Sequence, residues 1–416
     1  MSASIDAVAA PEPRAAVCAT ATIRVGLVGC GAFARFSMAR YRALPGVTIQ
    51  AVADIDPAAA QRAAAELEAD VLAPEALLVA PDVDLVYIAT PPATHFRQAR
   101  MAIEAGKHVL VEKPLATTVA DAETLAVLAD REGRCCVANL VERYNPLADA
   151  VRDVIRANLL GDLVHGLFVN DAADEGLGPR HWFWNRSVSG GIFVEHGVHF
   201  FDLVASWLGH GEVVAAARSV RPPRPGRGDA SPAAVEEQVM CICRYAAPGP
   251  ASRATDPACG DGNGHAGVLF HFEHGFHQPS RMDRQEMRLV FERGELRLFD
   301  WVPTHGELRA LLDDAAVAEV ADLLPAATVR TIDRYDGDAR HVRGRFRGFD
   351  ASGLVEIAFT VGKDKLGIYG DVVHDLAADQ IAWIRDPAHR RRLTEADSVA
   401  SVAMACAADR MALAAG

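Results

Sequence analysis

Lysine is scarce in this sequence of 416 residues. It occurs only at positions 107, 113, 363 and 365, and arginine supplies the other basic side chains. The eight cysteines form no paired Cys-x-x-Cys motif and no disulfide framework, so we expect reduced thiols in a cytoplasmic protein. Residues 1–20 have neither the apolar core of a signal peptide nor a twin arginine, which predicts a disordered tail. No run reaches transmembrane length, so no membrane partner is expected.

Charge and length set further bounds. The formal net charge is −13, which argues against nucleic acid or an anionic membrane surface as a partner. Half of the residues are hydrophobic, and they recur periodically as in a globular protein. Because 416 residues are too many for one ordinary core, two domains are predicted.

A glycine-rich motif follows the first apolar run. Residues 23–28 predict a buried parallel strand, which leads into Gly29-Cys30-Gly31-Ala32-Phe33-Ala34 and then a predicted helix, 32–43. Gly29 permits the tight turn, Gly31 lets the backbone approach a pyrophosphate, and Ala34 lets helix and strand pack closely. The motif predicts a dinucleotide loop with phosphates at the helix N-terminus. Cys30 is interpreted as a small loop filler, with an oxidation-sensitive thiol as the alternative.

The next predicted strand, 48–53, ends at Asp54. A carboxylate at this place accepts hydrogen bonds from both ribose hydroxyls and repels a 2′-phosphate. Ile55 and two further residues follow without an arginine that could receive such a phosphate. The sequence therefore favours NAD over NADP as the cofactor.

Strands and helices alternate as far as about residue 142. This alternation predicts an α/β domain over residues 21–142, a doubly wound parallel sheet of the Rossmann type. Ligands of such sheets bind beyond the carboxyl ends of the strands. Three strand ends are thus expected to face one crevice, namely the glycine-rich loop, Thr90-Pro91-Pro92 and Glu112-Lys113-Pro114. His95 begins the following helix and is expected either to approach the nicotinamide or to lie on the surface.

Lys113 stands just after a predicted buried strand, 108–111. A desolvated lysine can exchange a proton near neutrality, whereas arginine stays protonated. In a chain that uses arginine elsewhere, this lysine is a candidate catalytic residue. A strand-capping cation followed by a turn proline is the alternative.

The second domain, residues 143–416, is predicted to be α+β with a large, mostly antiparallel open sheet. Strand segments follow one another between about residues 213 and 370, with long Pro/Gly-rich loops at 222–232 and 246–267. Two further helices, 369–385 and 395–413, are expected to close the fold.

A predicted helix of the second domain, 192–208, carries a polar stripe. Glu195, His199 and Asp202 are spaced i, i+4 and i+7, which places them on one face. Such a stripe is costly to bury unless its members pair with one another or meet a ligand. Glu195 is expected to orient His199 or to pair with Lys113, and a satisfied buried Glu–His pair is the structural alternative.

Three histidines lie along the predicted strand 268–277, but no metal site is predicted. Alternation puts His271 and His277 on one face and His274 on the other, which argues against a three-histidine centre. His277 and Trp301 are expected to line a sugar pocket, with ordinary sheet packing as the equal alternative.

Together these motifs resemble the glucose–fructose oxidoreductase / inositol dehydrogenase / MocA (Gfo/Idh/MocA) family, most closely over residues 22–210. The matching elements, in order, are Gly29-x-Gly31-x-x-Ala34, Asp54, Thr90-Pro91-Pro92-x-x-His95, Glu112-Lys113-Pro114, Arg143-x-Asn145-Pro146 and Gly190-Gly191…Glu195-x-x-x-His199-x-x-Asp202. The resemblance implies binding of NAD(P) and oxidation or reduction of a carbinol of a sugar or cyclitol. The family lysine and histidine map onto Lys113 and His199. Glu195 stands where the family usually has aspartate, so its carboxylate is shifted by one methylene.

Motifs and resemblance together give the candidate site residues. The predicted catalytic residues are Lys113, His199 and Glu195. The predicted cofactor contacts are Gly29, Gly31, Ala32, Phe33, Ala34, Asp54, Ile55, Thr90, Pro91, His95, Glu112 and Lys113. The predicted substrate contacts are Arg143, Trp182, Glu195, His196, His199 and His277. His196 points to another side of its helix, where a structural role is the alternative.

These residues lead to the hypothesis that the protein transfers hydride between a polyol and nicotinamide C4. His199 takes the hydroxyl proton, and Lys113 stabilises the developing alkoxide. One rival is an NAD-dependent glycosidase or eliminase that oxidises its sugar transiently. Another is a non-catalytic nucleotide-sensing regulator, against which the presence of Lys113 and His199 argues. The resemblance also implies a homodimer or homotetramer, assembled through the open face of the second sheet.

Overall fold

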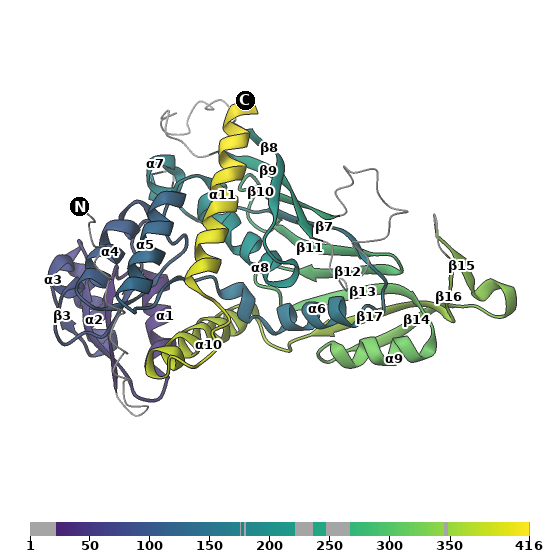
Figure 1. Cartoon of the computed structure of the whole chain (residues 1–416), viewed down its shortest axis with the longest axis horizontal. Helices are drawn as coiled ribbons and strands as arrows, with labels where there is room; N and C mark the ends of the chain where they lie inside the picture. The colour runs from purple at the N-terminus through teal and green to yellow at the C-terminus, as the bar shows by residue number, and fades with distance from the viewer. Residues whose placement is uncertain are drawn as a thin grey trace, which may run out of the picture.

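A computed structural model gives the fold of residues 22–174, 176–178, 180–220, 236–246, 267–344 and 348–415 (Figure 1). The predicted tail, 1–20, the predicted loop 222–232 and nearly all of the predicted loop 246–267 lie outside these described residues. The described chain is built around two large sheets, which occupy opposite ends of the view in Figure 1.

The N-terminal sheet has six parallel strands in the order β3-β2-β1-β4-β5-β6. This order confirms the predicted doubly wound fold, and its switch point lies between β1 and β4. The elements are β1 (Ile23–Val28), α1 (Ala32–Arg42), β2 (Val47–Ala53), α2 (Pro57–Leu67), β3 (Asp70–Val71), α3 (Pro74–Leu78), β4 (Leu85–Ile88), η1 (Pro92–Thr94), α4 (His95–Glu104), β5 (His108–Val111), α5 (Val119–Arg131) and β6 (Cys136–Ala138).

The central strands of this sheet are buried on both faces. Every residue of β4 and of β5 is buried, and their sequences are continuous apolar runs rather than alternating ones. Such runs are typical of parallel strands that helices cover on both sides. The polar residues that follow each strand are therefore left at the carboxyl edge, where the site is expected.

The second sheet has nine strands in the order β14-β17-β13-β12-β11-β7-β10-β9-β8. Only β7 and β10 pair in parallel, and all other neighbours are antiparallel, as predicted. The strands are β7 (Leu163–Asp171), β8 (Glu212–Ser219), β9 (Gln238–Ala246), β10 (Gly267–Gly275), β11 (Arg284–Phe291), β12 (Gly294–Phe299), β13 (His305–Leu312), β14 (Thr328–Arg334) and β17 (Gly353–Thr360). A small hairpin, β15 (His341–Arg343) and β16 (Gly348–Asp350), lies beside them at the end of the molecule (Figure 1).

The second domain also contains helices, several of which lie between the two sheets, whereas α9 lies at the far end of the molecule (Figure 1). They are η2 (Val141–Tyr144), α6 (Pro146–Ala157), η3 (Trp182–Trp184), α7 (Arg186–Ser189), α8 (Val198–Leu208), α9 (Asp314–Leu323), η7 (Gly337–Arg340), α10 (Lys365–Arg385) and α11 (Glu395–Ala415). Helix α9 was not predicted, because it interrupts a stretch that reads as successive strands. The predicted helix 192–208 begins with a π-helical turn, η4 (Phe193–Gly197), and continues as α8.

Helix α11 corrects one expectation. By length and composition its 21 residues could cross a membrane. It nevertheless runs between the two sheets in Figure 1 and packs against α5, α8 and β8. A core helix passes the same test of length and composition, so this helix is only weak grounds for a membrane span.

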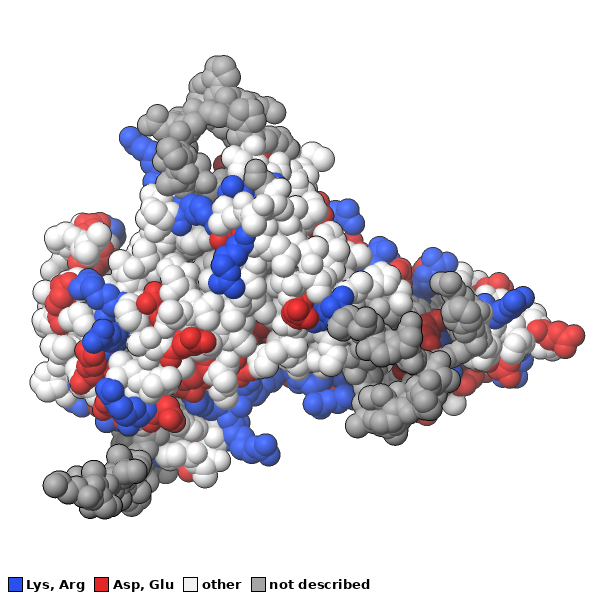
Figure 2. All heavy atoms as spheres, turned by 45° about the horizontal axis from the view of Figure 1, so that its top comes forward, with Lys and Arg blue, Asp and Glu red and all other residues white. Residues whose placement is uncertain are grey.

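Acidic and basic side chains are mixed over the N-terminal domain on the face drawn in Figure 2. The middle of that face is mostly uncharged. The negative net charge of the chain is therefore not gathered into one acidic field on this face.

Candidate active site

The glycine-rich loop leaves room for a ligand in front of α1. Gly29 has a φ of 92°, and a Cβ there would lie 2.4 Å from the backbone oxygen of Ala89, so only glycine fits the turn. A Cβ on Gly31 would meet nothing within 4 Å. The N-cap residue of α1 is Gly31, which has no side chain to cap the first N–H groups of the helix. These residues fit the pyrophosphate of a dinucleotide, as predicted for Gly29–Ala34.

Asp54 shapes the same loop. Its Oδ2 accepts from the Cys30 backbone N at 2.7 Å, and its Oδ1 accepts from the Asp56 backbone N at 2.8 Å. Each carboxylate oxygen keeps a lone pair for a ribose hydroxyl. Ile55, the next residue, is 95% exposed.

Cys30 is not suited to a redox role. It is buried, and its thiol points to the Ala53 carbonyl at 3.5 Å. Burial, reinforced by the Asp54 charge, raises the pKa of this thiol to about 12. Because the thiolate is the reactive form, this raised pKa favours the loop-filler interpretation over the oxidation-sensitive alternative.

His95 is buried, so the expectation that it lies on the surface is wrong. Its Nδ1 lies 2.8 Å from the Pro114 carbonyl and its Nε2 lies 2.7 Å from the Thr90 carbonyl. The imidazole thus bridges the two loops that follow β4 and β5. Burial lowers the pKa of His95 to about 4, so the ring is neutral at neutral pH. These two hydrogen bonds fix Thr90 and the loop that contains Lys113 relative to each other.

Glu112 lies behind Lys113 and faces inward. It accepts hydrogen bonds from the Tyr87 hydroxyl and from Asn139 Nδ2, the latter at 2.9 Å. Burial raises the pKa of Glu112 to about 7, although these donors and the Lys113 charge favour ionisation. This anchoring holds the strand end from which Lys113 projects.

Lys113 and Glu195 meet across the two domains. The ammonium forms an ion pair with the Glu195 carboxylate and donates to the Glu195 carbonyl at 2.9 Å. This carbonyl belongs to the π-helical turn, a geometry that recurs at functional sites. Of the two partners predicted for Glu195, the structure gives Lys113. The second oxygen of Glu195 is buried and has no hydrogen-bond partner among the described residues.

His199 follows one turn later and is also buried. Its Nδ1 has no hydrogen-bond partner within the described chain, so Glu195 does not orient it. Burial, with the charge of Lys113 as a second cause, lowers the pKa of His199 well below its usual value. The imidazole is therefore neutral at neutral pH and can accept a proton. The site thus presents the Lys113 ammonium together with a Glu195 oxygen and a His199 nitrogen, neither of which has a hydrogen-bond partner among the described residues.

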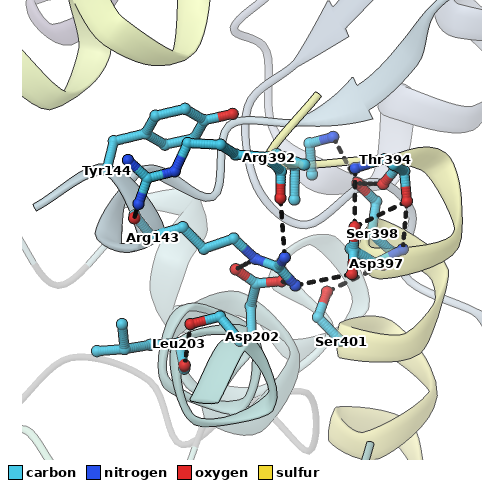
Figure 3. Close-up of polar contacts among 12 residues, drawn as sticks. Arg143, Tyr144, Asp202, Leu203, Arg392, Thr394, Asp397, Ser398 and Ser401 are labelled. Carbon is cyan, nitrogen blue, oxygen red and sulfur yellow. Dashed lines mark hydrogen bonds and ion pairs between the residues drawn. The ribbon is translucent and has the colours of Figure 1, made fainter. Parts of the chain in front are cut away.

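Arg143, predicted as a substrate contact, belongs to a buried polar network instead (Figure 3). It forms a bidentate ion pair with Asp202 at 2.6 and 2.7 Å and donates a further hydrogen bond to Asp397 at 2.9 Å. Burial raises the pKa of Asp202 to about 6, although Arg143 favours its charged form. The network joins η2, α8 and α11, which fixes the helix that carries His199.

The other predicted substrate contacts have partners of their own. His196 is buried, and its Nδ1 lies 3.1 Å from Nδ1 of His274. This position fits the structural role that was the alternative for His196. His277 lies 3.5 Å from Asp171 at a strand end. Trp182 is half-buried, and its ring contacts those of its neighbours His181 and Phe183.

Trp301 and, through it, three further residues are linked to His199. Trp301 has its ring centroid 5.9 Å from that of His199 and 5.2 Å from that of Tyr369. The Lys365 ammonium lies 5.2 Å from the Trp301 centroid, and its charge acts on the buried carboxyl of Glu142. Sequence reasoning named Trp301 but missed Glu142, Lys365 and Tyr369, because nothing local marks α10 and the η2 connection as neighbours of the site.

Comparison with known proteins agrees with this architecture. Residues 23–140 match the model described as "Oxidoreductase family, NAD-binding Rossmann fold", and residues 148–297 match the "GFO/IDH/MocA C-terminal domain". The fold and the dinucleotide loop thus define an NAD-binding oxidoreductase class of protein. The chain belongs to the Gfo/Idh/MocA family, as the motifs indicated.

Two curated relatives are similar over part of the chain. A dTDP-3,4-didehydro-2,6-dideoxy-alpha-D-glucose 3-reductase from Saccharopolyspora spinosa is 38% identical over 143 residues, 34% of this chain and 43% of that protein. A glycosyl hydrolase family 109 protein from Streptomyces niveus is 32% identical over 206 residues, 45% of this chain and 41% of that protein. The matches thus span less than half the length of either relative.

A solved structure supports the fold along nearly the whole chain. The levoglucosan dehydrogenase in complex with NADH and L-sorbose superposes with a TM-score of 0.70 and 18% sequence identity. The match covers 95% of this chain and 97% of that one. At this identity the likeness concerns the fold alone.

Proposed function

We propose that the protein is an NAD-dependent dehydrogenase that acts on a secondary hydroxyl of a sugar, sugar derivative or cyclitol. The observation that carries the proposal is the cluster of Lys113, Glu195 and His199 at the carboxyl edge of the Rossmann sheet. The cluster brings a cation, an anion and a neutral base together beside a dinucleotide loop. Such groups suit proton exchange with a carbinol.

Lys113 is proposed to contact the reacting hydroxyl oxygen. Its ammonium donates to the alkoxide that develops there and so stabilises the negative charge. The Glu195 ion pair and the Glu195 carbonyl hold the ammonium in one place. The open oxygen of Glu195 accepts from a second hydroxyl of the substrate.

His199 is proposed to take the hydroxyl proton. Its lowered pKa keeps the imidazole in the acceptor form, but it also makes His199 a weaker base than a free histidine. The proton therefore leaves readily only if Lys113 stabilises the alkoxide at the same time. Bound NAD would accept the hydride, while the protein supplies position and proton transfer.

The residues of the dinucleotide loop support NAD rather than NADP in this proposal. Asp54 stands where a 2′-phosphate would be repelled, and Ile55 and Asp56 beside it carry no positive charge. The relative with a sugar reductase name supports a sugar-like substrate, and the fold shared with an NADH complex supports a nicotinamide cofactor.

A panel of cyclitols, hexoses, amino sugars and nucleotide sugars tests the activity directly. Each compound is mixed with enzyme and NAD, and NADH is followed by absorbance. NADH formation with one structural group of compounds is the expected result. If none of them reduces NAD, the second candidate becomes the favoured one.

The second candidate is an NAD-dependent glycosidase or eliminase. It is favoured by the similarity to glycosyl hydrolase family 109 proteins. The same Lys113 and His199 would then oxidise the sugar transiently, and the hydride would return to it. Release of sugar product without net NADH would support this candidate against the dehydrogenase. Intact NAD binding without any turnover would instead favour a nucleotide-sensing regulator.

Self-association and a cytoplasmic location are also part of the proposal. One face of the second sheet leaves Met240, Ile242 and Leu269 exposed on neighbouring strands β9 and β10. Exposed apolar residues that adjoin each other are typical of interfaces. Light scattering in solution should give the mass of a dimer or tetramer, and a monomer would contradict this part.

A further inference from the structure

A buried carboxylate, that of Glu142, lies in η2. Glu142 is 1% exposed, and in the described part of the chain neither of its carboxylate oxygens has a hydrogen-bond partner. Its neighbour in sequence, Arg143, forms its ion pair with Asp202 rather than with Glu142. Buried carboxylates are expected to be paired, so an unsatisfied one calls for a reason.

The position of Glu142 relates it to the proposed active site. Its short helix packs against both α8, which carries His199, and α10, which begins with Lys365. The charge that acts on the Glu142 carboxyl is that of Lys365, whose ammonium lies over the ring of Trp301. Trp301 in turn contacts His199. Glu142 is therefore linked to the region of Trp301 and His199.

The charges around Glu142 favour a neutral partner. A substrate ammonium would meet the repulsion of Lys365, and that of Lys113 beyond it. Two adjacent hydroxyls of a ring, in contrast, can donate one hydrogen to each carboxylate oxygen, and these bonds favour the ionised form of a carboxyl whose pKa burial raises to about 8 in the ligand-free protein. Their own oxygens remain able to accept from Lys365. The half-buried faces of Trp301 and Tyr369 offer apolar surface to the ring carbons.

We propose that Glu142 is a substrate-binding residue that accepts hydrogen bonds from two neighbouring hydroxyls of a neutral polyol ring. Glu142 and Lys365 together form a diol subsite next to Trp301 and His199. This inference rests on the proposed function for the identity of the ligand, because it places a ring polyol in the same site.

Ligand-induced thermal stabilisation tests the subsite without requiring turnover. The NADH-bound wild type, Glu142→Gln and Glu319→Gln are unfolded with and without myo-inositol, levoglucosan, D-xylose or D-glucosamine. Glu319 is an exposed carboxylate of α9 and serves as the matched control. At least one neutral polyol should raise Tm of the wild type and of Glu319→Gln, and raise that of Glu142→Gln much less.

Three results would overturn the subsite. They are an equal rise in Glu142→Gln, no rise with any polyol, and a larger rise with D-glucosamine than with the polyols. If the variant fails to fold, Lys365→Met provides the same comparison, because it removes the other half of the subsite. Reduced polyol stabilisation is expected there too, and full stabilisation contradicts the proposal.

Steady-state kinetics separates this inference from the proposed activity. With a polyol that is turned over, Glu142→Gln should raise KM by about tenfold to a hundredfold, the cost of hydrogen bonds to a charged group, and change kcat little. NADH formation with an unchanged KM would refute the subsite and leave the dehydrogenase standing. Polyol stabilisation that depends on Glu142 but yields no NADH would refute the dehydrogenase and leave the subsite standing.

Discussion

Replacing Glu142 by glutamine should stabilise the ligand-free protein, and increasingly so as the pH rises. Burial raises the pKa of Glu142 from 4.5 to about 8, although Lys365 opposes this shift. Glutamine keeps the shape of the side chain but cannot ionise. The variant therefore removes only the proton linkage between folding and this carboxyl.

The sign and size follow from the two pKa values. Below pH 4.5 the carboxyl is protonated in both the folded and the unfolded chain, so it imposes no penalty. Between pH 4.5 and about 8 the unfolded chain loses the proton while the folded chain keeps it, so stability falls as pH rises. Each pH unit costs about 1.4 kcal/mol, which gives about 3 kcal/mol at pH 7 and about 5 kcal/mol above pH 8.

The assay is chemical denaturation of the wild type, Glu142→Gln and the control Glu319→Gln at several pH values from 5 to 8. The difference in unfolding free energy between Glu142→Gln and the wild type should grow by about 1.4 kcal/mol per pH unit. Subtraction removes the contributions of the buried histidines, which are common to all three proteins. A difference that stays flat with pH, or a loss of stability in Glu142→Gln, would show that the carboxyl is already partnered.

Three further substitutions test the supporting structure. Gly29→Ala should lower stability by a few kcal/mol and weaken NAD binding, because its Cβ would clash with Ala89 at a φ of 92°. Thermal unfolding and NAD titration measure the two effects, and an unchanged Tm would contradict the strained turn at Gly29. Arg143→Met should cost about 3–5 kcal/mol by leaving Asp202 buried and unpaired, whereas a cost under about 1 kcal/mol would contradict the network of Figure 3. Asp54→Ala should narrow the preference for NAD over NADP in fluorescence titrations, and an unaltered ratio would refute its proposed ribose contact.

The Rossmann half of the fold is predictable because its signals are local. The Gly29–Ala34 motif, the apolar runs that precede it and follow it, and the turn residues between them specify strand, loop and helix within short windows. Lys113 could be placed at the site for the same reason, since all parallel strands end at one edge of the sheet.

Features that depend on tertiary contacts were not predictable. The spacing of Glu195 and His199 assumed a regular α-helix, but the π-helical turn lets the Glu195 carbonyl reach Lys113. The burial of His95 and Glu142 depends on distant segments, Pro114 for the first and α10 for the second. Helix α9 was not predicted because the elements before and after it in the sequence are strands.

The most direct test of the proposed function compares Lys113→Ala with Lys363→Ala, an exposed lysine of the second domain. NADH formation with a substrate found in the panel is measured together with NAD affinity. Lys113→Ala should reduce kcat by about 10²- to 10⁴-fold with NAD affinity nearly unchanged, and Lys363→Ala should resemble the wild type. Turnover that survives in Lys113→Ala, or a parallel loss of NAD binding, would contradict the role assigned to this lysine.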